Sequence, residues 1–153
     1  MTIAVVVLLS APLLAGGLSL VVHRSTWLHG INLASIGALV TAETVLTHTV
    51  LSDGPVTALG ELVYLDALST FILFIIGVVG LACSFYMRSY MDEQVARGVI
   101  APSQLNQFFF LFHMFVLAMV IATIANSVGI QWVAIEATTL ATTFLIAFWK
   151  RRE

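Results

Sequence analysis

The chain has 153 residues, of which 60% are hydrophobic and 9% are charged, and its mean hydropathy is +1.05. Soluble domains carry about 25% charged residues, so this composition indicates an integral membrane protein and excludes a soluble globular domain. The formal net charge of −2 decides little, because the placement of the charges matters more than their sum. Cys83 is the single cysteine, which excludes an internal disulfide and any cysteine-rich metal or cluster site.

Five stretches are long and apolar enough to cross a bilayer, which takes about 20 apolar residues in a helix. They are residues 3–22, 27–50, 64–90, 105–125 and 131–149. The first has the apolar content of a signal peptide but no positively charged start, so we expect it to be retained as a span. The sequence therefore predicts an all-α integral membrane protein, with five transmembrane helices in one membrane domain covering residues 1–153.

The basic residues predict the orientation of these spans. With five spans, all six fall on one side of the membrane: Arg24, Arg88, Arg97, Lys150, Arg151 and Arg152. The segment between the second and third spans carries acidic residues instead: Asp53, Glu61 and Asp66. Because cytoplasmic loops are enriched in Lys and Arg, we expect a multi-pass protein of the inner cell membrane, with its N-terminus outside and its C-terminus in the cytoplasm.

The last span carries a carboxylate, Glu136, about six residues from its outer end, or roughly 9 Å along the helix axis. Thr139 and Thr143 share its face, and Thr138 and Thr142 lie beside that face. An ionisable group at this depth is costly, so a proton site is the favoured interpretation. The alternative is a structural carboxyl that is protonated or hydrogen-bonded between helices.

A second carboxylate, Glu43, lies at a similar depth in the second span, and Thr47 shares its face. It could form a second proton site or an outer vestibule. We slightly favour a simpler interpretation, in which the span ends early and residues 41–49 form a polar, partly hydrated helix end. Inside the third span, Gly77, Gly80 and Ser84 follow helical spacing and predict close packing of helices.

Histidines and one aspartate complete the set of candidate groups. His113 lies near the middle of the fourth span, where an imidazole suits proton relay. We favour a neutral histidine that is hydrogen-bonded to a neighbouring carbonyl. Asp66, at the mouth of the third span, fits a helix-start carboxylate as well as part of an exit path. His23 and His29 lie between the first two spans and are expected at the surface.

Two segments carry a resemblance to a known superfamily. YLDALSTFILFIIGVVGLACSFYMRSYM resembles the third-helix segment of the proton-pumping antiporter-like subunits of complex I, Mrp-type antiporters and energy-converting hydrogenases. FFFLFHMFVLAMVIATIANSVGIQWVAIEATTLATTFLIAF is most similar to hydrogenase-4 component F and related subunits. Members of this superfamily have about fourteen spans with two inverted repeats, so the chain corresponds to the first five helices of a longer fold.

The resemblance implies roles for a few residues. Glu136 matches the essential fifth-helix glutamate, which pairs with a lysine on the seventh helix during proton translocation. Asp66 and Ser69 match a third-helix motif of less certain role, and His113 receives no family role. Apart from Arg88 at the cytoplasmic end of the third span, the predicted spans contain no Lys or Arg, so the cation that pairs with Glu136 is expected to come from another chain.

These observations predict a truncated or split membrane subunit of a complex I-like or hydrogenase-4-like complex. It would contribute to proton translocation coupled to electron transfer by partner subunits, including the chain that supplies the missing helices. Two alternatives remain open: a structural or assembly subunit without transport, and an unrelated five-span membrane protein. The chain has no recognisable catalytic, cofactor-binding or metal-binding motif, so we expect no redox chemistry of its own and no nucleic-acid partner.

Overall fold

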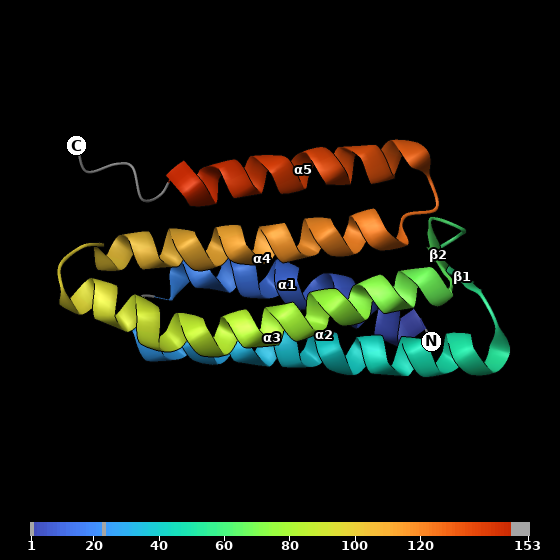
Figure 1. Ribbon diagram of the computed structural model, residues 1–153, viewed down its shortest axis with the longest axis horizontal. Helices are drawn as coiled ribbons and strands as arrows, with labels where there is room; N and C mark the ends of the chain where they lie inside the picture. The colour runs from blue at the N-terminus through green and yellow to red at the C-terminus, as the bar shows by residue number, and fades with distance from the viewer. Residues whose placement is uncertain (1, 23, 148–153) are drawn as a thin grey trace.

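The computed structural model describes residues 2–22 and 24–147, and these contain five helices long and apolar enough to span a membrane (Figure 1). The helices are α1 (Thr2–Val21), α2 (Ser25–Asp53), α3 (Ala67–Ala96), α4 (Pro102–Ile124) and α5 (Val128–Ala147). This confirms the predicted number and type of membrane-length elements. Some of the predicted features lie outside the described residues: His23, Lys150, Arg151 and Arg152.

Helices α1 to α4 form a four-helix bundle, and α5 lies outside it against α4 (Figure 1). Helices α1 and α3 each pack against both α2 and α4, which face one another across the bundle. Most of the largest fully buried side chains come from the bundle helices, among them Phe109, Leu8, Leu39 and Leu73. In α5 the buried residues are Ala134 and Ala141 alone, so this helix presents most of its circumference outward.

Small residues set the distance between α2 and α3. Gly77 and Gly80 are buried on α3, as the predicted packing stripe requires. A Cβ atom at Gly77 would collide with the carboxylate of Glu43 and lie 3.0 Å from Val40 Cγ2, and one at Gly80 would lie 3.4 Å from Ile36. The two helices therefore approach closely because the glycines leave room for α2 side chains.

A two-stranded hairpin, which the sequence did not predict, connects α2 to α3. Strand β1 (Val56–Ala58) pairs antiparallel with β2 (Val63–Leu65), and the hydrophobic residues of both strands point inward while the residue between them is exposed. Tyr64 therefore lies in a strand, not at the start of the third span. Three residues of alternation are too few to distinguish a strand from an apolar helix start.

Several helix ends differ from the predicted boundaries, and side-chain hydrogen bonds explain where α3 begins. Helix α3 begins at Ala67 because Asp66 accepts hydrogen bonds from the backbone N–H and the hydroxyl of Ser69, both at 2.8 Å. The same helix continues to Ala96, beyond the predicted end at residue 90. Helix α2 likewise extends past the predicted span at both ends.

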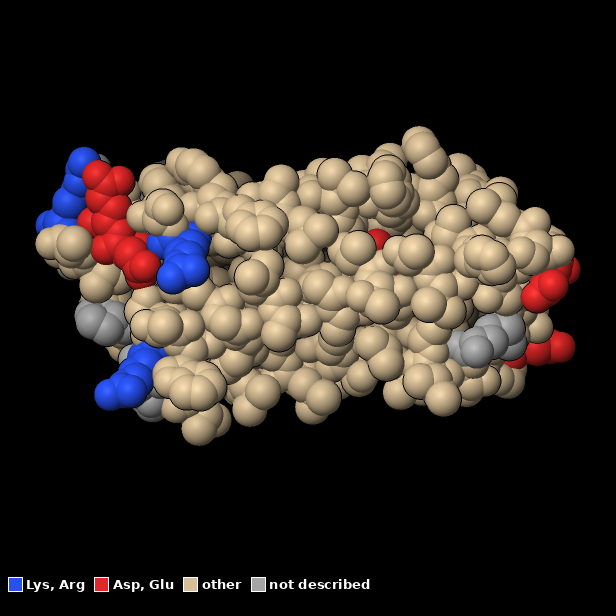
Figure 2. Space-filling view, turned by 90° about the horizontal axis from the view of Figure 1, so that it is seen from below, with Lys and Arg blue, Asp and Glu red and all other residues tan. Residues whose placement is uncertain are grey.

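On the face shown in Figure 2, most charged side chains gather at the two ends of the molecule, and the middle is uncharged apart from one small acidic area. Arg24 begins α2 and Arg97 ends α3, at the end of the bundle where α1 meets α2 and α3 meets α4 (Figure 1). The opposite end carries the hairpin with Glu61 and, beside it, Asp53 and Asp66. The described arginines thus share one end of the molecule, which is the premise of the predicted orientation.

Candidate functional site

The four candidate residues from the sequence lie on different elements. Glu136 is on α5, His113 on α4 and Glu43 on α2, while Asp66 precedes α3. Within the described residues, no hydrogen bond or ion pair joins any two of them. The candidates therefore do not form one site, and each has to be interpreted from its own surroundings.

Glu136 lies on the outward face of α5, where its side chain is exposed. Its neighbours on that face are Trp132, which is 66% exposed, and the exposed Thr139 and Thr143. The hydroxyls of Thr139 and Thr143 donate to the carbonyls of the residues four positions earlier, at 3.3 Å and 2.8 Å. In the described part of the chain no group pairs with the Glu136 carboxylate, so the polar face of α5 points away from the bundle.

Glu43 is buried, with 3% of its surface exposed. Helix α2 continues to Asp53, and Glu43 packs over Gly77 of α3, so this carboxylate points inward while Thr44 and His48 on the same stretch are exposed. Its Oε1 atom has no hydrogen-bond partner among the described residues. A groove of about 380 Å³ beside it is lined by residues of α2 and α3, including Thr44, Thr47 and His48.

His113 is fully buried inside the bundle, and its ring lies edge-on to Phe112 with the ring centroids 5.7 Å apart. The predicted hydrogen bond to a neighbouring carbonyl is absent, because neither ring nitrogen has a partner in the described structure. Gly16 of α1 lies against this part of α4, and a Cβ atom there would be 3.4 Å from the Cβ of His113. His113 therefore lies on the side of α4 that faces α1.

Asp66 has a structural role as the N-cap of α3. The hydrogen bond from the Ser69 backbone N–H, followed by that from its hydroxyl, holds the pKa of the Asp66 carboxyl below its usual range. Of the two interpretations the sequence left open, the helix-start carboxylate is the one whose hydrogen bonds are present. The carboxylate also orders the junction between the hairpin and α3.

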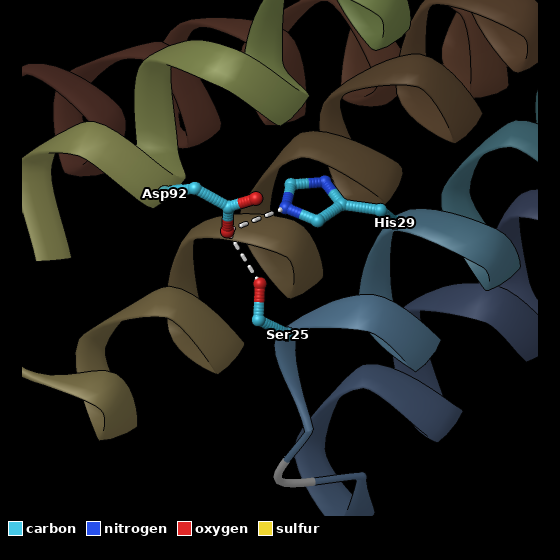
Figure 3. A network of polar contacts seen from close by, with 3 residues as sticks. All are labelled: Ser25, His29 and Asp92. Carbon is cyan, nitrogen blue, oxygen red and sulfur yellow. Dashed lines mark hydrogen bonds and ion pairs between the residues drawn. The ribbon is translucent and has the colours of Figure 1, made fainter. Parts of the chain in front are cut away.

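A polar network that the sequence interpretation missed lies at the arginine-bearing end (Figure 3). Asp92 of α3 accepts a hydrogen bond from the hydroxyl of Ser25 at 2.5 Å, and its Oδ1 atom lies 3.2 Å from Nε2 of His29. His29 was expected at the surface, but it is 8% exposed, and its ring lies edge-on to Phe109 of α4 at 5.3 Å. His29 is not at the surface because α2 begins at Ser25, so His29 lies within this helix on the face that packs into the bundle.

Two further buried polar residues follow His29 on α2. Asn32 and Ser35 are 1% and 5% exposed, and their side chains have no hydrogen-bond partner in the described structure. A signal was present in the sequence, because His29, Asn32, Ile36 and Leu39 follow the three-and-four spacing of one helix face. Polar residues on the same face as core residues indicate that the face is inward, so His29 could have been placed there.

Comparison with known proteins supports a distant relationship. The chain is 21% identical over 94 residues to the "Hydrogenase-4 component F homolog" of Methylacidiphilum infernorum (isolate V4). The match covers 61% of this chain and 20% of that protein, so the chain spans only a small part of this relative. No family model matches the chain, and no solved structure matches it. The resemblance noted in the sequence is thus supported at the level of a distant similarity to a hydrogenase-4 component.

Proposed function

We propose that this chain is a membrane subunit of a complex I-like or hydrogenase-4-like assembly, in which Glu136 forms half of a proton site. The other half comes from a second polypeptide that covers the outward face of α5. The observation that carries the proposal is the position of Glu136: a carboxylate on the exposed face of a membrane-length helix, with no pairing group in the described residues. The distant similarity to a hydrogenase-4 component supports the choice of assembly.

The exposed face of α5 would be costly to leave in contact with lipid, because it carries Glu136. Placing an acidic side chain at the centre of a membrane helix costs about 2.5–3.5 kcal/mol on insertion scales, so such residues rarely face lipid. Only 11% of the α5 span is buried inside the protein, against 33–39% for the other four helices. A partner helix on this face would remove Glu136 from lipid, and the hydroxyl oxygens of Thr139 and Thr143 could accept hydrogen bonds from it.

The partner also has to supply positive charge. The described arginines, Arg24, Arg88 and Arg97, lie at or near helix ends at one end of the molecule and not on α5. In the superfamily that the sequence resembles, the corresponding glutamate pairs with a lysine on another helix. A basic residue on the partner would favour the ionised carboxylate, and changes in their separation would change its proton affinity. Electron transfer in this proposal belongs to other subunits.

The test compares two glutamates of the assembled complex reconstituted in proteoliposomes. Glu136→Gln should abolish proton translocation while the subunits still co-purify, because glutamine keeps the size of the side chain and loses the titratable group. Glu61→Gln is the matched control, since Glu61 lies in the exposed hairpin turn outside the spans, and it should pump normally. Normal pumping by the Glu136 variant would overturn the proposal.

A structural or assembly role without transport is the second candidate, and the close packing of α2 on Gly77 favours it. In that case Glu136→Gln is silent in every assay, whereas Gly77→Leu prevents the complex from assembling. If Gly77→Leu leaves assembly intact, the packing of α2 on Gly77 is not required for assembly. The structural role would then lose its support.

The proposed orientation has the arginine-bearing end in the cytoplasm and the hairpin outside. It can be tested by single-cysteine labelling of intact cells in a Cys83→Ser background. A membrane-impermeant maleimide should label Glu61→Cys directly and Glu93→Cys only after permeabilisation, because these exposed residues lie at opposite ends of the bundle. The reverse pattern would invert the topology.

A further inference from the structure

Five polar atoms in the centre of the bundle lack hydrogen-bond partners among the residues that the structure describes. They are the two side-chain polar atoms of Asn32, the hydroxyl of Ser35 and both ring nitrogens of His113. The three residues are at most 5% exposed. Buried polar groups in membrane proteins are normally satisfied by protein or water, because lipid offers no alternative partner. Because these unpaired polar atoms lie on neighbouring helices, one shared hydrogen-bonding partner would satisfy them.

The inner face of α2 directs two of these residues to the same side. His29, Ile36 and Glu43 mark the flank of α2 that faces α3, because they lie against Asp92, Gly80 and Gly77, respectively. Ala38 and Ala42 line a groove with residues of α1 and mark the other flank. At 100° per residue, Ser35 lies on the α1 flank with Ala42, and Asn32 lies between the two flanks.

Packing between the diagonal helices places His113 at the same depth. The ring of His29 on α2 packs against Phe109 on α4, and both helices run away from the arginine-bearing end (Figure 1). Asn32 lies three residues beyond His29, and His113 lies four residues beyond Phe109. At 1.5 Å per residue these steps are about 4.5 Å and 6 Å, so Asn32 and His113 occupy nearly the same level.

His113 also lies on the α1 side of α4, where Gly16 approaches its Cβ atom. Ser35 has a hydroxyl that makes no bond to its own helix, in contrast to the buried Ser19 and Ser84, whose hydroxyls bond the carbonyls four residues earlier at 2.7 Å and 2.8 Å. Serine in a helix usually makes that bond, so the Ser35 hydroxyl is available to another partner.

We propose that Asn32, Ser35 and His113 line a water-binding chamber between α1, α2 and α4. The ligand is a small cluster of water molecules, since the residues offer both donors and acceptors and buried water typically makes about three hydrogen bonds to groups of this kind. The chamber does not involve α5, and its existence does not depend on the role proposed for Glu136.

The Ser25–His29–Asp92 network forms the entrance to this chamber (Figure 3). The Asp92 side chain is 50% exposed, whereas that of His29 is 7% exposed, so the pair crosses from the surface to the interior. Nε2 of His29 contacts Asp92, and Nδ1 has no partner in the described structure. In this proposal the ring lies between a surface carboxylate and the buried polar residues, and water would reach His113 from the arginine-bearing end.

Water-edited solid-state NMR of the full chain, uniformly labelled with ¹⁵N in lipid bilayers, tests the chamber directly. Magnetisation from water should reach the ring nitrogens of His113 several-fold faster than it reaches the backbone amide of buried Leu46, which serves as a dry reference in the same helix bundle. Equal, slow build-up at both positions would show that the centre is dry and would overturn the proposal.

Two serine variants provide a matched pair for the same measurement. Ser35 and Ser84 are 5% and 6% exposed, but the hydroxyl of Ser84 is already bonded to the Gly80 carbonyl. Ser35→Ala should slow water transfer to His113, and Ser84→Ala should leave it unchanged. If both variants slow the transfer equally, the Ser35 hydroxyl does not belong to the chamber. His29→Leu should slow it further by closing the entrance, and the measurement on the unmodified chain remains decisive if a variant does not fold.

Discussion

The α1–α4 bundle and α5 use polar residues in opposite ways. In the bundle, His29, Asn32 and Glu43 point inward and the outer surface is apolar. In α5 the polar residues, with Glu136 among them, point outward, and the small residues Ala134 and Ala141 contact the bundle. Both regions consist of helices long and apolar enough to span a membrane, so hydropathy alone does not separate them. The difference teaches that α1–α4 turn their polar residues toward a shared interior, whereas α5 is packed on one side only and exposes its polar side.

The largest effect should come from a glycine substitution that tests how tightly the bundle is packed. Gly77→Leu would force a side chain into Glu43 and Val40, and we expect it to lower the free energy of unfolding by about 1–3 kcal/mol. Unfolding by denaturant in detergent micelles measures the change.

The matched control for this substitution lies on α5. At Gly129 a Cβ atom meets only the Ser127 hydroxyl oxygen, at an ordinary 3.8 Å, so Gly129→Leu should have little effect on unfolding. Equal losses of unfolding free energy in the two variants would mean that α5 is packed as tightly as the bundle. That result would contradict the difference between α5 and the α1–α4 bundle.

The cap of α3 is expected to have the next largest effect. Asp66→Ala removes the side chain that accepts from Ser69 and should cost about 1 kcal/mol of stability. Because the pKa of Asp66 is lowered in the folded state, its contribution is complete above about pH 4 and is lost as the pH falls through the lowered pKa. Unfolding curves between neutral and acid pH measure it. Asp66→Asn, which still caps a helix, should restore most of the stability and remove the part of the acid-induced loss that Asp66 contributes, and a pH dependence identical to that of the unmodified chain would contradict the assignment.

Two neighbouring acids at the arginine-bearing end separate an inward polar contact from a surface one. Asp92→Ala removes the partner of Ser25 and the buried His29 and should cost on the order of 1 kcal/mol. Glu93→Ala removes only an exposed pair with Arg97 and should cost roughly 0.5 kcal/mol or less. Thermal unfolding of both variants measures the difference. Indistinguishable midpoints would show that the Asp92 network adds nothing to the bundle.

The smallest effect on the isolated chain is expected at Glu136. Its side chain has no partner among the described residues, so Glu136→Gln should change the free energy of unfolding by less than roughly 0.5 kcal/mol. Denaturant unfolding in micelles again gives the value. A large loss would mean that Glu136 supports the fold of this chain itself, and α5 would then not be the open side of the molecule.

The sequence predicted the membrane helices well because their signal is local. An uninterrupted apolar stretch of about 20 residues is sufficient evidence of a span, whatever lies next to it. The packing stripe at Gly77 and Gly80 was also predictable, because small residues at helical spacing have few other uses in such a helix. Both inferences rest on residues close together in the chain.

The inward and outward faces of the helices were not predictable in the same way. The inward position of His29 could be inferred from its helix face, but its partner Asp92 lies 63 residues away, and no local pattern reveals that contact. Glu43 looked like part of a hydrated helix end because threonines surround it in sequence, yet its position is decided by Gly77 on another helix. In a membrane protein both faces of a helix are apolar, so the contrast that marks the inner face of a soluble helix is weak. The hairpin was missed because its strands have only three residues each.

The hairpin also determines how α5 leaves the bundle. Val63 of β2 forms a bridge with Ala125, and Asn126 binds the carbonyls of Leu62 and Glu61 through its backbone N–H and its side-chain amide at 2.9 Å and 2.8 Å. These bonds anchor the short turn between α4 and α5 to a segment that precedes α3. The first residue of α5 is therefore held in place by the rest of the chain, and the direction of its polar face is set before any other polypeptide arrives. An incoming helix would meet a pre-organised surface, and its association would sacrifice less conformational freedom than docking to a loosely hinged helix.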